Sequence, residues 1–307
     1  MSLGLLVAEP WGDYGLVDSG NGRKLERYGP YSFIRPEPQA MWAPAAPAWD
    51  ADGEFVPGSD VERARRAPGT TADSRGQSAP AQGGGRWLFH RPVPKEGWTL
   101  AWEEVRFRAQ CTPFRHLAFF PDMAPQWAWM RERTAEGSEM LNLFGYTGVG
   151  TLALAARGAS VVHVDASKKS VAAGKENADL SGLAGRPIRW IIDDAAKFTA
   201  REARRGRRYD GIILDPPKYG RGPAGEIWRL EEDLPGLIAD CRRLLDESSR
   251  FLVLTVYAVR MSALSLGEML RQALADLGGE LECGEMAVRE EKRGLLLPTA
   301  IFARWSR

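Results

Sequence analysis

Four groups of residues in this 307-residue chain could bind a ligand or carry chemistry, and each directly follows an apolar run. They are a small-residue turn at 145–150 (GYTGVG), Asp165, the pair Asp193 and Asp194, and the run Asp215-Pro216-Pro217-Lys218. Glycines let a backbone approach a ligand, and carboxylates accept hydrogen bonds from hydroxyl and amino groups. We expect the four groups to line one site, because the carboxyl ends of parallel strands meet at one edge of a sheet.

Strands and helices that alternate along the chain must position these residues. Apolar patterns predict strands at 139–144, 160–166, 188–193, 209–217 and 250–258, and helices at 149–158, 167–183, 194–206, 232–246 and 264–278. This alternation is typical of a parallel sheet covered by helices on both faces. Two extended runs with no helix between them, 280–290 and 295–305, should form an antiparallel pair at one edge. The predicted fold class is therefore α/β.

The amino-terminal part of the chain differs in composition. Residues 1–115 contain short apolar runs broken by Gly and Pro, which predict a smaller β-rich accessory domain. Within it, 72–85 (ADSRGQSAPAQGGG) has almost nothing to bury, so we predict a mobile loop there. A helical connector at 116–138 then leads into the second domain, which is predicted to span 139–307.

Composition limits the function. The 41 basic and 40 acidic side chains give a net charge of +1, so any contact with nucleic acid would have to be local. No apolar run approaches the roughly 18 residues of a membrane span, and LGLLVA at 3–8 lacks the basic flank and cleavage site of a signal peptide. We therefore predict a cytoplasmic protein without membrane contact. Neither a disulfide framework nor a metal site is predicted, because the cysteines and histidines are scattered: Cys111, Cys241, Cys283, His90, His116 and His163.

Each group of candidate residues also has a purely structural interpretation. The glycine turn can serve close packing alone, Asp165 or Asp194 can cap a helix, and Asp215 with its two prolines can merely end a strand. All four groups at the ends of consecutive strands favour a ligand that contains a nucleoside.

Two familiar nucleotide sites do not fit. Gly145, Gly148 and Gly150 do not match the dinucleotide fingerprint G-x-G-x-x-G, and no Gly-Lys-Ser/Thr of a P-loop follows them. Tyr257 and Arg260 do not make the Tyr-Lys proton relay of a dehydrogenase. Hydride transfer is therefore not favoured.

Several segments resemble a known family. NLFGYTG (142–148), HVDASKKSVAAGKENADLSGL (163–183), RRGRRYDGIILDPPKYGRG (204–222) and the closing strand pair resemble class I S-adenosylmethionine-dependent methyltransferases. The resemblance covers about 114–307 and is to the group related to bacterial large-subunit ribosomal RNA methyltransferases. It implies a Rossmann-like class I methyltransferase sheet, S-adenosylmethionine as cofactor and RNA, ribosomal RNA in particular, as partner.

The resemblance also implies roles for individual residues. The family's motif around the methionine part of the cofactor is matched by Asn142, Phe144, Gly145, Tyr146, Thr147 and Gly148. Asp165 and Ala166 match the ribose and adenine-edge positions, and Asp194 with Ala195 matches the pair near the adenine amino group. RHLAFFPDMAPQWAWM (115–130) resembles the connector that closes over the cofactor, with Phe120, Pro121 and Asp122 at its matching positions.

The motif beside the transferred methyl group is matched by Asp215, Pro216, Pro217 and Lys218, which the resemblance makes the catalytic residues. A rigid Asp-Pro-Pro turn presents an acceptor side chain and free backbone carbonyls, which can hold an exocyclic amine by its hydrogens. Where amine-directed enzymes place a stacking aromatic, this chain has Lys218 and only then Tyr219. This departure leaves the target atom open.

A cysteine nucleophile is not expected. Methylating carbon 5 of cytosine needs a thiolate, but the fourth and fifth predicted strands end in DPPKYG and VLTVYAVRMS. Cys241 falls in a helical apolar stripe, and Cys283 lies in the closing strand pair. We expect direct transfer to nitrogen or oxygen, with Cys111 the first cysteine to suspect otherwise. Two alternatives stay open: a methyltransferase for a small molecule or protein, and a non-catalytic RNA-binding module that retains the fold.

Other basic and aromatic residues allow two interpretations each. The arginines at 201–208 precede the fourth predicted strand, so we expect a solvated surface away from the cofactor end. Lys218, Arg221 and Arg229 follow that strand and are better candidates for phosphate contacts. Trp127 and Trp129 could stack a base, but packing within the connector helix is the commoner role.

Overall fold

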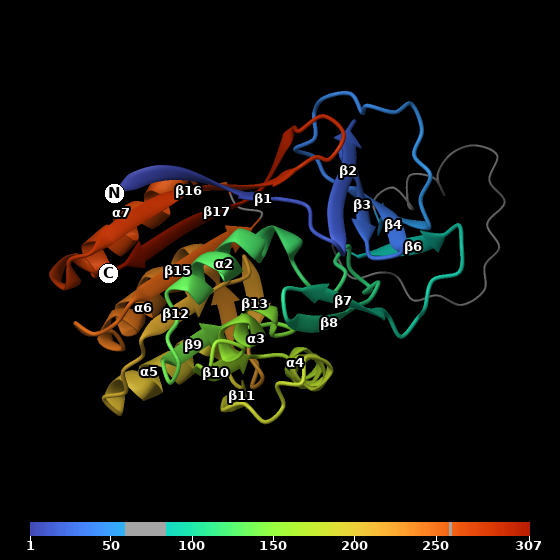
Figure 1. Ribbon diagram of the computed structural model, residues 1–307. Coiled ribbons are helices and arrows are strands. Elements are labelled where there is room, and N and C mark those ends of the chain that lie inside the picture. Colours follow the sequence, from blue (N-terminus) through green and yellow to red (C-terminus); the bar gives the residue numbers. More distant parts are fainter. Residues whose placement is uncertain (59–83, 258–259) are drawn as a thin grey trace.

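The computed structural model describes residues 1–58, 84–257 and 260–307, and its largest element is an eight-stranded sheet (Figure 1). Its strands, in spatial order, are β1 (Ser2–Ala8), β16 (Glu280–Arg289), β17 (Leu296–Ser306), β15 (Phe251–Tyr257), β12 (Gly211–Leu214), β9 (Glu139–Leu143), β10 (Ser160–Asp165) and β11 (Ile188–Ile192). The five strands from β15 to β11 are parallel, and β17 runs antiparallel to both of its neighbours. The predicted α/β fold class with its antiparallel carboxy-terminal pair is confirmed.

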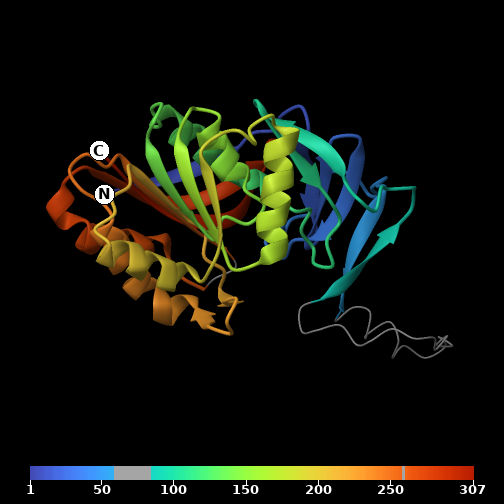
Figure 2. The ribbon, with the colours of Figure 1, turned by 90° about the horizontal axis from the view of Figure 1, so that it is seen from below.

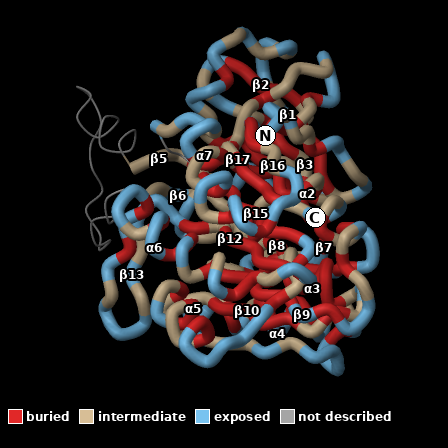
Figure 3. The backbone as a smooth tube through the Cα atoms, turned by 90° about the vertical axis from the view of Figure 1, so that its left-hand side faces the viewer, coloured by how far each residue is buried: buried red, intermediate tan, exposed pale blue. Residues whose placement is uncertain are grey.

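Helices cover both faces of this sheet (Figure 2). Successive side chains of a strand point to opposite faces, so Ile213 joins one core while Ile212 and Leu214 join the other. The first core includes residues of α2 (Ala124–Glu132), α3 (Val149–Ala155) and α4 (Lys168–Leu180). The second includes residues of α5 (Ala195–Arg204), α6 (Leu230–Arg243) and α7 (Ala263–Ala273). Figure 3 shows the central strands as a continuous buried layer.

The amino-terminal region contributes two smaller sheets. One has five strands: β2 (Tyr14–Gly20), β3 (Arg23–Tyr28), β4 (Tyr31–Pro36), β5 (Gly53–Pro57) and β6 (Gly85–Phe89). The other pairs β7 (Trp98–Trp102) with β8 (Val105–Ala109), and β8 packs on α4 through a hydrogen bond from the Arg108 amide to Asn177 Oδ1 (2.9 Å). A further hairpin, β13 (Tyr219–Arg221) with β14 (Ile227–Arg229), follows the Asp-Pro-Pro run.

The edge of the large sheet differs from the sequence prediction. Residues 2–8, predicted as part of the accessory domain, pair in parallel with β16 and make the outermost strand of the large sheet. The carboxy-terminal pair is therefore not the edge, because β1 covers the hydrogen-bonding groups that β16 would otherwise expose. The predicted mobile loop at 72–85 lies outside the described residues up to 83, and Gly85 begins β6. Within the described ranges, no helix has the length and apolar character that a membrane crossing requires.

The two parts of the molecule are joined by the turn between β16 and β17, which reaches the sheet of β2 (Figure 1). Arg293 in this turn donates to Asp18 Oδ1 (3.1 Å), to the Ser19 carbonyl (2.7 Å) and to Glu290 Oε2 (2.7 Å). Asp18 and Glu290 are fully buried, and a buried carboxylate needs such partners. The carboxy-terminal hairpin thus holds the amino-terminal sheet beside the large one.

Candidate functional site

Two adjoining cavities lie at the carboxyl ends of the parallel strands. The smaller holds about 450 Å³ of empty space and is lined by the turn after β9 and by the connector helix α2. The larger is an open cleft of about 2920 Å³, bounded by the large sheet, the connector and residues 37–39 of the amino-terminal region. Four side chains line both cavities: Phe120, Phe144, Tyr146 and Asp215. They mark the place where the two cavities meet.

The turn after β9 has an unusual backbone. Phe144 (φ 58°) and Tyr146 (φ 48°) are left-handed although neither is glycine, and Gly148 (φ 82°) is left-handed as well. Gly145 cannot carry a side chain, because a Cβ atom there would collide with the ring of His163. Close packing therefore explains Gly145, as the structural interpretation of the motif expected. The same turn nevertheless lines the smaller cavity, so its role in packing does not exclude a role in binding a ligand.

A buried polar chain lies under the turn. Asn142 Nδ2 donates to Thr151 Oγ1 (2.9 Å), and that hydroxyl lies 2.9 Å from His163 Nδ1. Burial lowers the pKa of His163 to about 3, so the imidazole is neutral at physiological pH. Asn142 also lines the smaller cavity, whereas His163 lines neither.

Asp165 holds the turn from the neighbouring strand. Its Oδ2 accepts from the Tyr146 amide (2.9 Å), and its Oδ1 accepts from the Ser167 amide (2.8 Å). The cap of α4 is Ser167, so Asp165 does not serve as a helix cap. Its carboxylate lines the cleft together with Ala166, and burial raises its pKa.

Asp194 does serve as a helix cap. Its Oδ1 accepts from the Lys197 amide (2.9 Å) at the start of α5. Its neighbour Asp193 forms an ion pair with Arg201 (2.6 Å), and both carboxylates line the larger cleft with Ala195. Asp194 Oδ2 accepts no hydrogen bond from any residue that the structure describes, so one oxygen is left for a ligand.

Asp215 follows β12 at the junction of the cavities. Burial, together with the carboxyls of Asp122 and Asp165, raises its pKa to about 8. Of the run that follows it, Pro216, Pro217 and Lys218 line the larger cleft. The Pro217 carbonyl, expected to be free, accepts from Trp228 Nε1 (2.7 Å).

The connector closes the junction from the opposite side. The ring of Phe120 lies 5.7 Å from that of Tyr146 and 5.1 Å from that of Tyr257. Pro121 and Asp122 follow in a buried 3-10 helix but line neither cavity. Asp122 Oδ2 is buried without a hydrogen-bond partner among the described residues, and burial raises the pKa of this carboxyl.

The two tryptophans of α2 differ. Trp127 is buried, packs on Trp102 with ring centroids 5.2 Å apart and lines the smaller cavity. Trp129 packs against Phe251 and under the guanidinium of Arg304, and it lines neither cavity. Both tryptophans therefore pack against neighbouring side chains, and Trp127 also lines the site.

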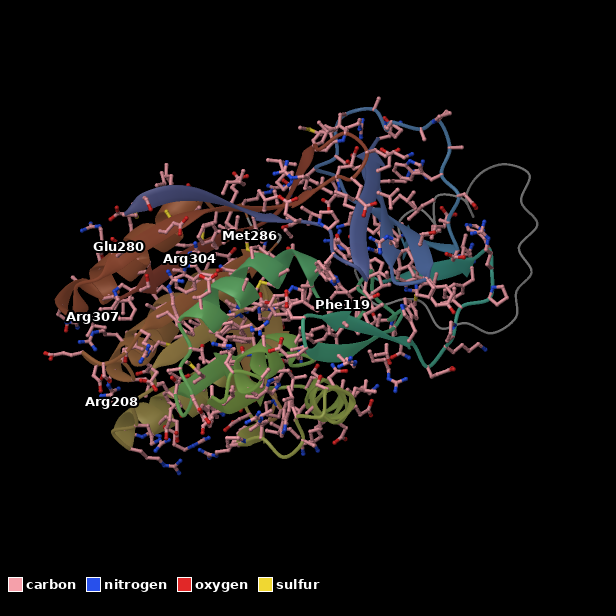
Figure 4. All side chains as sticks on the ribbon, viewed as in Figure 1. Phe119, Arg208, Glu280, Met286, Arg304 and Arg307 are labelled. Atoms are coloured by element: carbon pink, nitrogen blue, oxygen red, sulfur yellow. The ribbon has the colours of Figure 1, made fainter. Side chains whose placement is uncertain are left out.

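Four of the five arginines at 201–208 form ion pairs with described residues, the exception being Arg204. Arg207 pairs with Glu139 (2.6 Å) at the start of β9, and Arg205 pairs with Glu202 (2.9 Å). Figure 4 shows Arg208 at the lower left of the molecule, away from Phe119 near its centre, which lines the smaller cavity. Only Arg201 reaches a residue of the cleft, through Asp193.

Sequence reasoning missed one wall of the larger cleft. It consists of residues 37–39, residues 112–116, Glu285 and residues 298–301. These segments lie far apart in the sequence, and none follows a parallel strand of the large sheet. The aromatic and basic residues of Pro113-Phe114-Arg115-His116 were the only local signal.

The chain is similar to known proteins in sequence and in structure. Residues 76–249 match the family profile of S-adenosylmethionine-dependent methyltransferases. The crystal structure of an S-adenosylmethionine-dependent methyltransferase from Agrobacterium tumefaciens is 40% identical, with a TM-score of 0.88 over 99% of this chain and 95% of that chain. A methyltransferase complexed with SAH, 16% identical with a TM-score of 0.69 over 96% of this chain and 75% of that one, shares the fold.

Curated relatives match over shorter segments. Ribosomal RNA large subunit methyltransferase I of Aeromonas hydrophila is 36% identical over 29% of this chain and 23% of its own length. Ribosomal RNA large subunit methyltransferase K/L of Hahella chejuensis is 32% identical over 46% of this chain and 19% of its own length. The chain thus spans about a fifth of the length of these two relatives.

The raised pKa of Asp215 predicts how stability depends on pH. An unfolded Asp ionises near its ordinary value of 3.8, whereas folded Asp215 keeps its proton to about pH 8, so folding loses stability as pH rises between these values. The Asp215→Asn variant has no ionisable group at this position, so its free energy of unfolding should be higher than that of the wild type by on the order of 5 kcal/mol at pH 8, with little change at pH 4. Urea denaturation without cofactor measures both values.

A matched control has the opposite sign. Asp246 accepts hydrogen bonds from Ser248, which lower its pKa below the ordinary value of 3.8, so Asp246→Asn should lose stability at both pH 8 and pH 4, because this contribution disappears only at lower pH. An Asp215→Asn variant that is less stable than the wild type at pH 8 would contradict the raised pKa.

Proposed function

The chain belongs to the family of S-adenosylmethionine-dependent methyltransferases, and we propose that its substrate is RNA, with ribosomal RNA as the class. The observation that carries the proposal is the position of Asp215, where a small cavity meets a much larger cleft. A site of this shape can hold a cofactor on one side and a nucleobase that projects from a longer chain on the other.

The residues around the smaller cavity suit the cofactor, which supplies a methyl group on a positively charged sulfur. We assign its methionine part to the cavity lined by Asn142, Phe144, Gly145, Tyr146, Thr147 and Gly148. Each oxygen of Asp165 has accepted one backbone hydrogen bond and can accept another, which suits a ribose diol beside Ala166.

The adenine half is assigned to the adjoining part of the cleft. Asp194 Oδ2 can accept a hydrogen bond from an exocyclic amine, and Ala195 leaves room beside it. Phe120 closes the junction from the connector, and Pro121 fixes the backbone that carries it. The fit therefore rests on the remaining acceptor capacity of Asp165 and Asp194 and on the small side chain of Ala195.

Asp215 is assigned to the acceptor group of the substrate. A positive charge in the smaller cavity would lower its pKa from about 8, because an opposite charge favours the ionised carboxylate. The ionised Asp215 can then hold an N–H or O–H group and take its proton. Pro216 and Pro217 keep the turn rigid, and Lys218 is exposed where a phosphate could bind.

Two observations favour RNA over a small molecule. Four basic side chains from different segments line the larger cleft and form no ion pair with any described residue: Arg115, Lys169, Lys218 and Arg221. Unpaired cations at the mouth of a cleft suit phosphates, and the curated relatives are named as ribosomal RNA methyltransferases. The near-neutral net charge favours the alternative, a small-molecule or protein substrate.

Radiolabelled methyl transfer to unmodified total RNA, protein extract and a metabolite pool tests the substrate class. We expect label in the RNA, abolished by ribonuclease, and reduced about a hundredfold in Asp215→Ala, because that change removes the group that positions the acceptor. Cofactor affinity should stay within a few-fold. Label confined to protein or metabolites would reject RNA, and absence of label from all three would favour the non-catalytic alternative.

The assignment of Asp165 is tested by cofactor binding. Asp165→Ala loses charged hydrogen bonds and should raise the dissociation constant of S-adenosylmethionine about ten- to a hundredfold. The melting temperature should also fall, because the Tyr146 amide loses its acceptor. Ser167→Ala is the matched control: it removes the cap of α4 but keeps the carboxylate, so calorimetry should find affinity within about threefold of the wild type.

Direct transfer without a cysteine nucleophile is proposed from the surroundings of the three thiols. None of them lines either cavity, and burial raises the pKa of Cys111 to about 12 and that of Cys241 still further. Since the thiolate is the nucleophile, these thiols are poorly suited to attack a base. The acceptor is therefore proposed to be nitrogen or oxygen.

A variant with all three cysteines changed to serine should retain most of its methyl transfer to RNA, if it remains folded. The melting temperature and cofactor affinity serve as checks on folding, because Cys241 and Cys283 are buried. A variant that binds cofactor but transfers no methyl would overturn the proposal, as would a covalent adduct on RNA that contains 5-fluorocytosine.

A further inference from the structure

The turn at residues 112–116 carries an exposed aromatic side chain at the larger cleft. Phe114 is 59% exposed, and among the large apolar side chains that are mostly exposed in the described residues, it is the one that lines the cleft. Thr112, Arg115 and His116 line the cleft beside it. An exposed Phe is unremarkable alone, but one at the mouth of a binding cleft is a candidate contact for a ligand.

The turn is held in place by hydrogen bonds from several directions. Thr112 Oγ1 lies 2.8 Å from the His116 carbonyl, to which it donates, and accepts from the Phe114 amide at 3.3 Å. Trp87 Nε1 donates to the Thr112 carbonyl (2.7 Å), and Arg35 Nη1 donates to the Arg115 carbonyl (2.8 Å). Phe114 is therefore presented to solvent by an ordered backbone, which reduces the entropy that binding must remove.

Arg35 anchors the turn to the amino-terminal sheet. This guanidinium is buried and donates to Glu26 Oε2 (2.7 Å) and to the Tyr28 hydroxyl (2.6 Å). Two strands of the small sheet thus support one backbone carbonyl at the cleft. The arrangement gives the amino-terminal region a part in the site although it contributes little to the smaller cavity.

His116 offers a neutral hydrogen-bonding group. Its ring nitrogens form no hydrogen bond with any residue that the structure describes, and its ring lies 5.0 Å from that of Phe120 at the junction of the cavities. Burial, and then the nearby charges of Arg35 and Arg115, lower its pKa to about 3. The imidazole can therefore donate from one nitrogen and accept at the other throughout the physiological range.

The charged side chains near the turn at 112–116 favour a phosphate beside Arg115 rather than further inside the cleft. Arg115 forms no ion pair with a described residue, whereas the facing Glu37 is paired with Lys24 (3.4 Å). Glu285 also faces the cleft and would repel a phosphate placed deeper. A nucleotide with its base inside the cleft and its phosphate at Arg115 would place the negative charge beside this arginine and away from Glu285.

We propose that the turn at 112–116, called the recognition turn below, binds an unpaired nucleotide of the substrate RNA, with a base stacked on Phe114, its phosphate at Arg115 and a base edge hydrogen-bonded to His116. The inference rests on the proposed function, since it names the part of an RNA that the same cleft would take. Stacking on an aromatic face requires an unpaired base, so the turn selects single-stranded RNA over duplex.

Binding of a fluorescein-labelled single-stranded RNA of mixed sequence, about 12 nucleotides long, tests the proposal by anisotropy with S-adenosylhomocysteine present. Phe114→Ala should weaken binding about tenfold or more, and Phe114→Trp should stay within about threefold, because every base can stack on either ring. Phe89→Ala is the matched control, since Phe89 is also exposed (50%, against 59% for Phe114) but does not line the cleft. The corresponding duplex should bind far more weakly than the single strand.

A second variant separates the aromatic ring from its support. Thr112→Val keeps Phe114 but removes the hydroxyl that fixes the turn, so we expect a smaller loss, about three- to tenfold, with unchanged cofactor affinity. In methyl transfer to RNA, Phe114→Ala should raise KM and leave kcat nearly unchanged. A merely structural role would lower cofactor affinity and the melting temperature instead.

The outcomes separate this inference from the proposed function. Oligonucleotide binding by Phe114→Ala equal to that of the wild type, or no binding by the wild type, overturns the recognition turn even if total RNA is methylated. Phe114-dependent binding together with methyl transfer only to protein or metabolites would retain the recognition turn and reject the proposed substrate class.

Discussion

The site depends on one strained turn of backbone, the five residues from Phe144 to Gly148. Left-handed conformations at Phe144 and Tyr146 cost on the order of 1–2 kcal/mol each, so neighbouring residues must hold them. Asp165 does so from β10 through the Tyr146 amide, Asn177 of α4 donates to the Thr147 carbonyl (2.9 Å), and the Thr147 hydroxyl donates to the Ala118 carbonyl (2.6 Å). The turn thereby connects the sheet, a helix and the connector at the edge of the smaller cavity.

The other side of the site is built from segments far apart in the sequence. The connector, the β16–β17 hairpin and the amino-terminal sheet meet at the larger cleft, and buried charges fix how they meet. Arg35 joins β3 and β4 to the recognition turn, and Arg293 joins the hairpin to β2. Losing one partner of such a buried pair leaves an uncompensated charge, which is far more costly than losing a surface ion pair. The relative position of the two parts is thus specified by few, strong interactions.

Local sequence patterns predicted most of the large sheet, because an apolar run and the small residues after it lie within one strand and its turn. Strands β9, β10 and β11 begin where they were expected, and the candidate residues that follow the strands do line the cavities. Contacts between distant segments were not predictable in this way. Nothing within residues 2–8 indicates pairing with β16. The sequence also could not tell that Asp194 caps a helix whereas Asp165 holds the turn after β9, because these roles depend on where each side chain points. The wall at 112–116 was missed because its support comes from Arg35 and Trp87.

The electrostatics of the site favour a positively charged ligand. Asp122, Asp165 and Asp215 all have raised pKa values, which means that the ligand-free fold opposes their ionisation. Burying several carboxyls together lowers the stability of the free protein, and a cation placed among them recovers part of that loss. In the proposed arrangement the sulfonium of the cofactor is that cation. S-adenosylhomocysteine has a neutral sulfur, so Asp215, the one of these carboxyls that lines the smaller cavity, should favour the methyl donor over the product by up to a few-fold. The feature that destabilises the empty site would therefore help the enzyme exchange product for new cofactor.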